Sequence, residues 1–425
     1  MSLINENTVE HNGVKIHSIS TEKFKTNTIV LRLSAPLNKE DVTLRALLPH
    51  VLQRAAADFP STTELRRYLD ELYGATLHVD LSKKGEKHII TFRMEIANEH
   101  YLKDSEPLLE KGMQLLSQIL LKPLVENGRF SETIVNQEKR TLKQRIQAVY
   151  DDKMRYSNLR LVQEMFKNEP YALHVNGEVD AIDQITPQSL YEYYSRILKE
   201  DKIDLYIVGD VKDEEAAEYA KKYFFIHDHM SSKSMAEKKT VSAGEVNEVI
   251  EKQDVKQGKL NMGFRTNIVY SDSDYYALQV LNGIYGGFSH SKLFINIREK
   301  ESLAYYAASR VESHKGVLMV MSGIEEANYD KALTIIKKQM EEIKNGNVSD
   351  QELSQTKAVI NNQLLETIDT SYGMIEVLYH NEISGTDRTF DEWMNGISSV
   401  TRDEVIDAAK KIELDTIYFL KGDAQ

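Results

Sequence analysis

Residues 286–305 form the most informative stretch of this sequence. They read Gly286-Gly287-Phe-Ser-His-Ser-Lys-Leu-Phe-Ile-Asn-Ile-Arg298-Glu-Lys-Glu-Ser-Leu-Ala-Tyr305. A helical pattern ends at the glycine pair, a residue type that commonly terminates helices. A second helix follows, and a strand is expected to begin near Leu303. Taken by itself, the segment is also compatible with a tight turn in which Arg298 and Tyr305 are ordinary surface or packing residues.

Outside this stretch, the chain can be aligned with itself in two halves. Near the end of each half, Ile182-Asp-Gln-Ile-Thr-Pro-Gln-Ser-Leu190 parallels Ile397-Ser-Ser-Val-Thr-Arg-Asp-Glu-Val405. Each segment leads through a helical pattern into a predicted strand that ends in Gly-Asp, at 209–210 and at 422–423. Self-similarity within a chain indicates a repeated architecture.

Further matches extend the repeat. Ser349 with Glu352 forms a capping box before one long helical pattern, and Ser131 is expected to cap the equivalent helix without the glutamate. A strand and then a helix are expected at 27–33 and 43–54 in one half, and at 259–264 and 275–285 in the other. The predicted fold class is therefore α+β, with two similar domains in which helices pack on one face of a sheet.

The two domains are expected to span residues 1–226 and 246–425, joined by a linker at 227–245. The linker prediction rests on a polar run that is rich in small residues and has no helical period. His227 and His229 lie in this run and are expected to be surface residues without a function.

Composition excludes several classes of protein. The chain has 425 residues, no cysteine and a formal net charge of −13. The acidic balance argues against a nucleic-acid protein and against docking on anionic membranes. The lack of cysteine excludes disulfides, thiolate metal sites and cysteine nucleophiles. The amino terminus shows no signal-peptide pattern, and no apolar run approaches the length of a membrane span, so a cytoplasmic location is expected.

A search for catalytic motifs finds none that is complete. His-Glu-x-x-His and His-x-x-Glu-His are both absent, as are the phosphate-binding loop and the Gly-x-Ser-x-Gly nucleophile turn. His50 stands alone on a predicted helix, where a single histidine is usually structural. The residues by themselves therefore define no self-sufficient active site.

The stretch from Gly286 to Tyr305 resembles the carboxyl-terminal domain of the M16 (insulinase-like, pitrilysin-like) metallopeptidase family. That family has a glycine-rich turn followed by Ser-x-Leu-Phe-x-x-Ile-Arg-Glu-Lys-x-x-Leu-Ala-Tyr, and the internal repeat extends the resemblance over nearly the whole chain. The resemblance implies two homologous M16-type domains, each with a mixed or antiparallel sheet and helices on one face. It also implies that the domains face each other around a chamber.

The resemblance further implies where zinc would bind, and there this sequence departs from the family. Active members carry His-x-x-Glu-His on the first long helix, and its glutamate activates a zinc-bound water. When Phe59-Pro60 is matched to the family's Tyr-Pro, the first histidine becomes Ala46, the general base becomes Pro49, and only His50 remains.

The later helix departs from the family as well. Its third zinc ligand falls on Arg145, and Glu138 matches a nearby acid of the family that cannot replace the ligand set. His78 stands on the strand that helps to hold substrate, where active relatives have Asn. A catalytic zinc needs three protein ligands, so the chain alone is expected to bind no metal or other cofactor and to hydrolyse no peptide.

Two functions are compatible with this pattern. In some M16 pairs, a zinc-less subunit keeps an Arg and a Tyr seven residues apart, which stabilise the oxyanion; Arg298 and Tyr305 match that pair. The chain would then be the helper of a zinc-bearing M16 paralogue in a heterodimer, or a homodimer, acting on a peptide or unfolded segment. Alternatively, it is a binding or scaffold protein of M16 fold without a proteolytic role. A narrower resemblance is to a bacterial zinc-less subgroup whose label refers to elongation factor P modification, a chemistry that no residue here supports.

Overall fold

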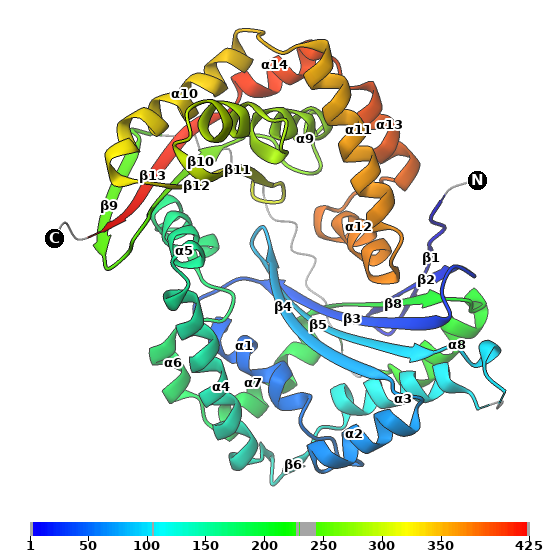
Figure 1. Ribbon diagram of the computed structural model, residues 1–425. Coiled ribbons are helices and arrows are strands. Elements are labelled where there is room, and N and C mark those ends of the chain that lie inside the picture. The colour runs from blue at the N-terminus through cyan, green and yellow to red at the C-terminus, as the bar shows by residue number, and fades with distance from the viewer. Residues whose placement is uncertain (1–2, 104–105, 227–228, 230–243, 423–425) are drawn as a thin grey trace.

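The computed structural model describes residues 3–103, 106–226, 229 and 244–422 (Figure 1). Two large β-sheets dominate it, one in each half of the chain. The elements of the first half are β1 (Asn7–His11), β2 (Val14–Ser20), β3 (Thr26–Pro36), α1 (Val42–Leu52), α2 (Thr62–Glu71), β4 (Thr76–Lys84), β5 (Lys87–Ala97), η1 (Glu99–Tyr101), α3 (Leu108–Leu121), β6 (Val125–Glu126), β7 (Arg129–Phe130), α4 (Glu132–Asp151), α5 (Lys153–Met165), η2 (Pro170–Ala172), α6 (Val179–Gln184), α7 (Pro187–Glu200), β8 (Lys202–Gly209) and α8 (Asp213–Tyr223).

The second half repeats the pattern of a sheet followed by helices. Its elements are β9 (Asn247–Gln253), β10 (Gly258–Arg265), α9 (Tyr275–Asn282), η3 (Gly283–Gly287), η4 (Phe294–Lys300), β11 (Ala304–Glu312), β12 (Val317–Ile324), η5 (Glu326–Asn328), α10 (Tyr329–Lys344), α11 (Asp350–Thr367), α12 (Ser371–Ser384), α13 (Phe390–Ser399), α14 (Arg402–Lys410) and β13 (Glu413–Gly422).

The two sheets share one strand order. The six-stranded sheet runs β1-β2-β8-β3-β5-β4, and the five-stranded sheet, taken from its far edge, runs β9-β13-β10-β12-β11. Matching β2 with β9 and β3 with β10 makes the two orders identical apart from β1. Pairing directions agree as well: β2 and β8 are parallel, as are β9 and β13, while the other neighbours in both sheets are antiparallel. The predicted α+β fold with a duplicated architecture is therefore confirmed.

One face of each sheet is covered by helices of its own half. Alternate residues of β3, namely Ile29, Leu31 and Leu33, are fully buried in a core shared with α1, α3 and α7. Because successive strand residues point to opposite faces, this spacing of two assigns one face to the core. In the second half, β10 contributes Leu260 and Met262 to a core shared with α9, α10 and α14.

The opposite face of each sheet is covered by a helix from the other half. α12 lies across the first sheet (Figure 1), where Ile375 and Tyr379 pack against Val30 and Tyr206. In return, α5 packs on the second sheet, with Leu161 and its neighbours against Val317 and Tyr418 of that sheet. The two halves thus exchange one helix each, an arrangement that the sequence repeat did not reveal.

Of three predictions about local structure, the one for Ser349 is confirmed, because Ser349 caps α11 in a capping box with Glu352. The predictions for Ser131 and His229 were wrong. Ser131 precedes α4, but its side chain makes no capping hydrogen bond; it joins the helix through its carbonyl, which accepts from the Val135 N–H at 3.0 Å. His229 is part-buried and lies with Nε2 2.7 Å from the Asp201 carbonyl oxygen, so it is not a free surface residue.

The predicted linker lies almost entirely outside the described residues, and His227 with it; residues 229, 244 and 245 are its described members. Within the described part of the chain, every helix is too short or too polar to traverse a lipid bilayer.

Candidate functional site

The predicted zinc locus lies where α1 packs against α4. Ala46 and Pro49 are buried there, whereas the next residue, His50, keeps part of its surface exposed. Pro49 lies inside the helix, where its ring nitrogen has no hydrogen to donate to the preceding turn. The position matched to the general base therefore carries neither a carboxylate nor a backbone N–H.

The charged groups that act on His50 are both cations. Burial, and then the charges of Arg145 and Arg54, lower the pKa of His50 to about 4, so its ring is neutral at pH 7. Arg54 is itself held by a buried acid, because its Nε lies 2.6 Å from Oε1 of Glu138 and that carboxylate is 2% exposed. Glu138, the one acid identified in this locus from the sequence, is thus already paired.

Arg145 has no such partner. Among the described residues, its guanidinium makes no hydrogen bond or ion pair, and its Nη1 is buried. A guanidinium is permanently protonated and has no lone pair for a metal, and a catalytic zinc needs three protein ligands. Of the predicted set, His50 alone could donate to zinc. The residues present do not fit a catalytic zinc, and no chemical step is assigned to one.

The edge strand β4 lies beside the end of α1. Gln53, which follows α1, donates from Nε2 to the Leu77 carbonyl oxygen at 2.9 Å. His78 is the next residue on β4, exposed and opposite Arg93 of β5. His78 therefore follows a residue that is bonded to the end of α1, and no hydrogen bond of the described residues links His78 to His50.

The glycine-rich turn is a wide, π-helical turn. α9 ends at Asn282, and residues 283–287 form a π-helical turn, η3, that contains Gly286 and Gly287. A Cβ on Gly286 would lie 2.8 Å from the Ser309 backbone nitrogen, so glycine is required where the turn approaches β11. The second predicted helix is present as η4, and β11 begins at Ala304, one residue after the expected start.

Arg298 and Tyr305 are both presented to solvent. Tyr305 is 80% exposed and makes no hydrogen bond among the described residues. Arg298 is exposed near the end of η4, with its guanidinium 4.6 Å from the ring centre of Phe294 and its Nε 3.8 Å from Glu299. Neither residue serves to pack a core. No hydrogen bond or ion pair within the described residues joins this pair to His50 or Arg145, so the chain carries two separate candidate sites.

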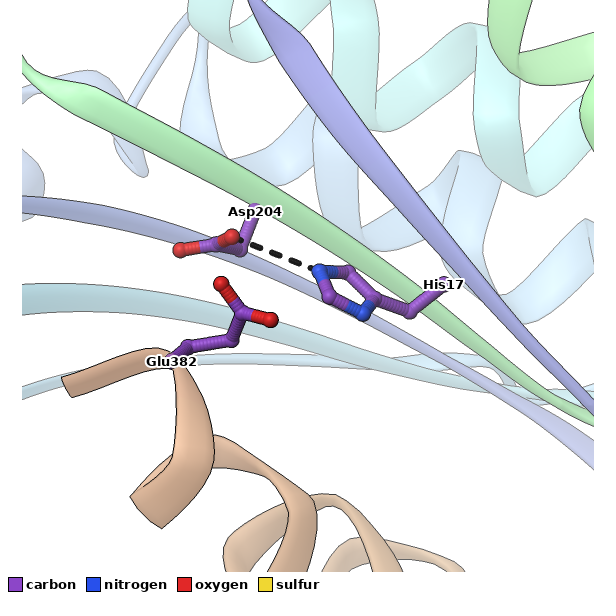
Figure 2. A group of neighbouring side chains, drawn as sticks. All are labelled: His17, Asp204 and Glu382. Carbon is purple, nitrogen blue, oxygen red and sulfur yellow. Dashed lines mark hydrogen bonds and ion pairs between the residues drawn. The ribbon is translucent and has the colours of Figure 1, made fainter. Parts of the chain in front are cut away.

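A buried polar cluster, not identified from the sequence, joins the two halves. His17 of β2, Asp204 of β8 and Glu382 of α12 bring their side chains together on the sheet face that α12 covers (Figure 2). His17 Nε2 lies 3.3 Å from Asp204 Oδ1, and His17 Nδ1 lies 2.7 Å from Glu6. The nitrogen and oxygen atoms of His17, Asp204 and Glu382 that could bind a metal lie within 4.8 Å of one another, a spacing compatible with a metal ion.

Two lysines already neutralise this cluster. Lys15 and Lys202 both form ion pairs with the Glu382 carboxylate, and Lys202 Nζ also lies 3.6 Å from Asp204. Burial alone would lower the pKa of His17, but hydrogen bonds and charge from Asp204 and Glu6 outweigh it and raise that pKa. Because Lys15 and Lys202 of the first half pair with Glu382 of the second, the cluster is an ion-pair network between the halves.

A second cluster missed from the sequence involves two histidines. His314, in the turn between β11 and β12, has its Nε2 2.7 Å from Nδ1 of His380 on α12, and Tyr270 stacks on both rings. Burial is the main cause that lowers the pKa of His314 to about 2 and that of His380 to about 3. Strand pairing, such as Lys15 opposite Asp204, is the signal that could find the first cluster, and that pairing is not visible in the sequence.

The fold and the locus together define a class: a duplicated α+β chain with two sheets of one strand order, in which the residues at the predicted zinc locus do not form a catalytic zinc site. Residues 184–360 match the family described as "Peptidase M16 inactive domain". The chain is 56% identical to the "Probable inactive metalloprotease YmfF" of Bacillus subtilis strain 168, over 99% of each chain. The chain belongs to the M16 family, as an inactive-type member.

Two further similarities help to place it. A crystal structure of a conserved protein from Enterococcus faecalis V583 superposes with a TM-score of 0.92 at 35% identity, covering 99% of each chain. The "Uncharacterized zinc protease YmxG" of Bacillus subtilis strain 168 is 21% identical over 69% of this chain and 71% of its own length. One bacterium thus encodes relatives of both kinds, one described as inactive and one as a zinc protease.

Proposed function

We propose that this chain is the zinc-less helper subunit of a cytoplasmic heterodimeric M16 peptidase, with a zinc-bearing M16 paralogue as its partner. The observation that carries the proposal is the contrast between the two candidate sites. Ala46 and Arg145 stand where the resemblance places zinc ligands and Pro49 where it places the general base, whereas Arg298 and Tyr305 match the oxyanion pair and are both exposed.

The chemistry of the exposed pair suits this role. A guanidinium and a phenol both donate hydrogen bonds, and donors directed at a developing oxyanion stabilise a tetrahedral intermediate. Arg298 is the stronger of the two, because hydrogen bonds from a charged donor are about twice as strong as neutral ones. A peptide bound at a sheet edge by backbone hydrogen bonds would bring its carbonyl to these donors, while the partner supplies the zinc.

The test is peptide hydrolysis by a mixture of this chain and the zinc-bearing paralogue from the same host. Arg298→Ala should lower turnover by about 10²- to 10³-fold, the usual effect of losing one oxyanion donor, with a much smaller change in substrate affinity. Arg402→Ala is the matched control, since Arg402 of α14 has a side chain that is 42% exposed and forms an ion pair with Asp350. Unchanged turnover with Arg298→Ala would remove the catalytic role.

The second candidate is a peptide-binding or scaffold protein of M16 fold that takes no part in hydrolysis. The observation that favours it is Arg145, which introduces a positive charge where the family's chemistry needs a metal ligand. This candidate predicts that the two chains form a complex in which no pairing increases peptide cleavage.

A further inference from the structure

The outer edge of β9 has no partner strand among the described residues. β9 is the last strand of the five-stranded sheet, where it pairs with β13 alone, and it lies at the margin of the molecule (Figure 1). A free edge presents backbone N–H and C=O groups that can pair with another strand. At the equivalent edge of the first sheet, β2 is covered by the antiparallel strand β1. In the described part of the chain, the second sheet therefore lacks the strand that closes the first.

The side chains along this edge are exposed and complementary to themselves. Glu248, Ile250 and Lys252 alternate along β9 and so share one face of the sheet. All three are exposed, Ile250 to 51% although it is apolar. Glu248 accepts a hydrogen bond from the Tyr329 hydroxyl at 2.7 Å, whereas the Lys252 side chain makes no ion pair or hydrogen bond within the described residues. The acid and the lysine stand at equal distances along the strand from the apolar residue between them.

We propose that two copies of this chain pair through β9, antiparallel and centred on Ile250, so that their two five-stranded sheets become one continuous sheet. In that register the two Ile250 side chains meet, and Glu248 of each copy lies opposite Lys252 of the other. Opposite charges in directly opposed positions stabilise a strand pair, and like charges destabilise it. Both copies use the same surface, as a two-fold axis requires.

This pairing leaves the oxyanion pair free. β11, which carries Tyr305, is the opposite edge strand of the same sheet. The inference therefore does not rest on the proposed function, and a copy paired through β9 still has its β11 edge available.

A protective role for the charges on β9 predicts a different behaviour. Charged side chains on an edge strand hinder pairing between molecules, and protection needs no particular order of signs. It predicts a monomer at every concentration. Pairing predicts instead that the order of signs matters, because Glu248 must meet Lys252 and not a second glutamate.

Sedimentation velocity of the full chain over a series of concentrations tests for the dimer. The mass should rise from that of the monomer towards twice that value. A dissociation constant in the micromolar range is expected, because a single strand pair is smaller than a standard protein interface.

Charge reversal then assigns the dimer to this edge. Glu248→Lys places lysines opposite each other in both charge pairs and should weaken the dimer at least about tenfold. Adding Lys252→Glu to that variant restores opposite charges and should restore most of the affinity. Glu366→Lys is the matched control: it makes the same change of charge at an exposed position of α11, on the far side of the second half from β9 (Figure 1).

Cross-linking tests the register. The chain has no cysteine, so Ile250→Cys supplies one thiol per copy. Directly opposed residues of an antiparallel pair have Cα atoms about 4.5–5.5 Å apart, a separation that a disulfide spans. Oxidised glutathione should therefore convert this variant into a covalent dimer. Lys252→Cys faces Glu248 of the other copy and should cross-link much more slowly.

Three results would each overturn the inference. They are a chain that is still monomeric at about 1 mM, a dimer that Glu248→Lys does not weaken, and equal cross-linking of the Ile250→Cys and Lys252→Cys variants. The proposed function falls on a different result, unchanged turnover with Arg298→Ala.

Discussion

At the residue scale, one buried arginine forms an ion pair between the two halves. Arg32 of β3 is 1% exposed, and its guanidinium lies 4.0 Å from the ring centre of Tyr379 on α12. Its charge is balanced by Glu376 of α12, which also lies 3.1 Å from Lys84 of β4. Burial alone would raise the pKa of Glu376, but the charges of Arg32 and Lys84 outweigh it and hold that pKa at about 2.

Glu376→Gln should therefore destabilise the protein strongly. It leaves the Arg32 charge buried without a counterion, a change that costs about 3–5 kcal/mol. The measurement is the free energy of unfolding from urea titrations followed by circular dichroism. Glu341→Gln is the control: Glu341 pairs with Lys344 on the surface of α10, and exposed pairs contribute about 0–1 kcal/mol. A loss below about 1 kcal/mol with Glu376→Gln would show that Arg32 finds another partner.

Also at the residue scale, the electrostatics of the predicted zinc locus could not be predicted from the sequence. Ala46, Pro49 and Arg145 were found by matching the family's motif to linear positions. The pairing of Arg54 with Glu138, which leaves Arg145 as the unopposed charge, joins residues 84 positions apart. It depends on how α1 packs on α4, and no local pattern records that packing.

At the scale of elements, α12 is a helix whose role could not be predicted from the sequence. Its apolar residues do not form a single stripe, because Met374, Ile375 and Leu378 pack against a sheet of the other half while polar residues on the same helix also become buried. A helix that is covered on several sides loses the periodicity that predicts which face it buries.

His380 of this helix, together with His314, should make the free energy of unfolding fall steeply in acid. His380 and His314 have a pKa near 3 and near 2 in the folded state, against about 6.5 in an unfolded chain. Between pH 6.5 and about 3 the unfolded state binds more protons than the folded state, so the free energy of unfolding falls as the pH falls. The stabilising contribution of the two histidines is fully present above pH 6.5. Each histidine contributes up to about 1.4 kcal/mol per pH unit.

Urea titrations at a series of pH values test this dependence. His380→Gln keeps a hydrogen-bonding side chain but removes one titrating ring. The slope of the free energy of unfolding against pH should therefore decrease below pH 6.5 by about the contribution of one histidine. His78→Gln, at an exposed position of β4, should leave the slope unchanged. His17 acts in the opposite direction, because its raised pKa stabilises the fold below pH 6.5 and the effect is lost as the pH rises through the folded value. An unchanged slope with His380→Gln would contradict the prediction that His314 and His380 are both neutral in the folded protein.

At the scale of the whole molecule, the repeat explains both what was predictable and what was not. Matching sequence segments such as 182–190 and 397–405 predicted two related halves, and the shared strand order bears this out. The same argument could not show that the halves exchange α5 and α12, since contacts between repeats leave no trace in the likeness of the repeats. The clusters at His17 and His314 arise from that exchange: α12 contributes Glu382 to the first and His380 to the second.

The proposed function is that the first half has no catalytic zinc site while the second half supplies oxyanion donors to a zinc-bearing partner. The measurement that tests it most directly is chelator-sensitive peptide hydrolysis, with zinc content, for the purified chain alone and for its mixture with the zinc-bearing paralogue. The account predicts no zinc and no cleavage for the chain alone, and faster cleavage by the mixture than by the paralogue. Tightly held zinc with chelator-sensitive cleavage by this chain alone, or a mixture no faster than the paralogue, would contradict it.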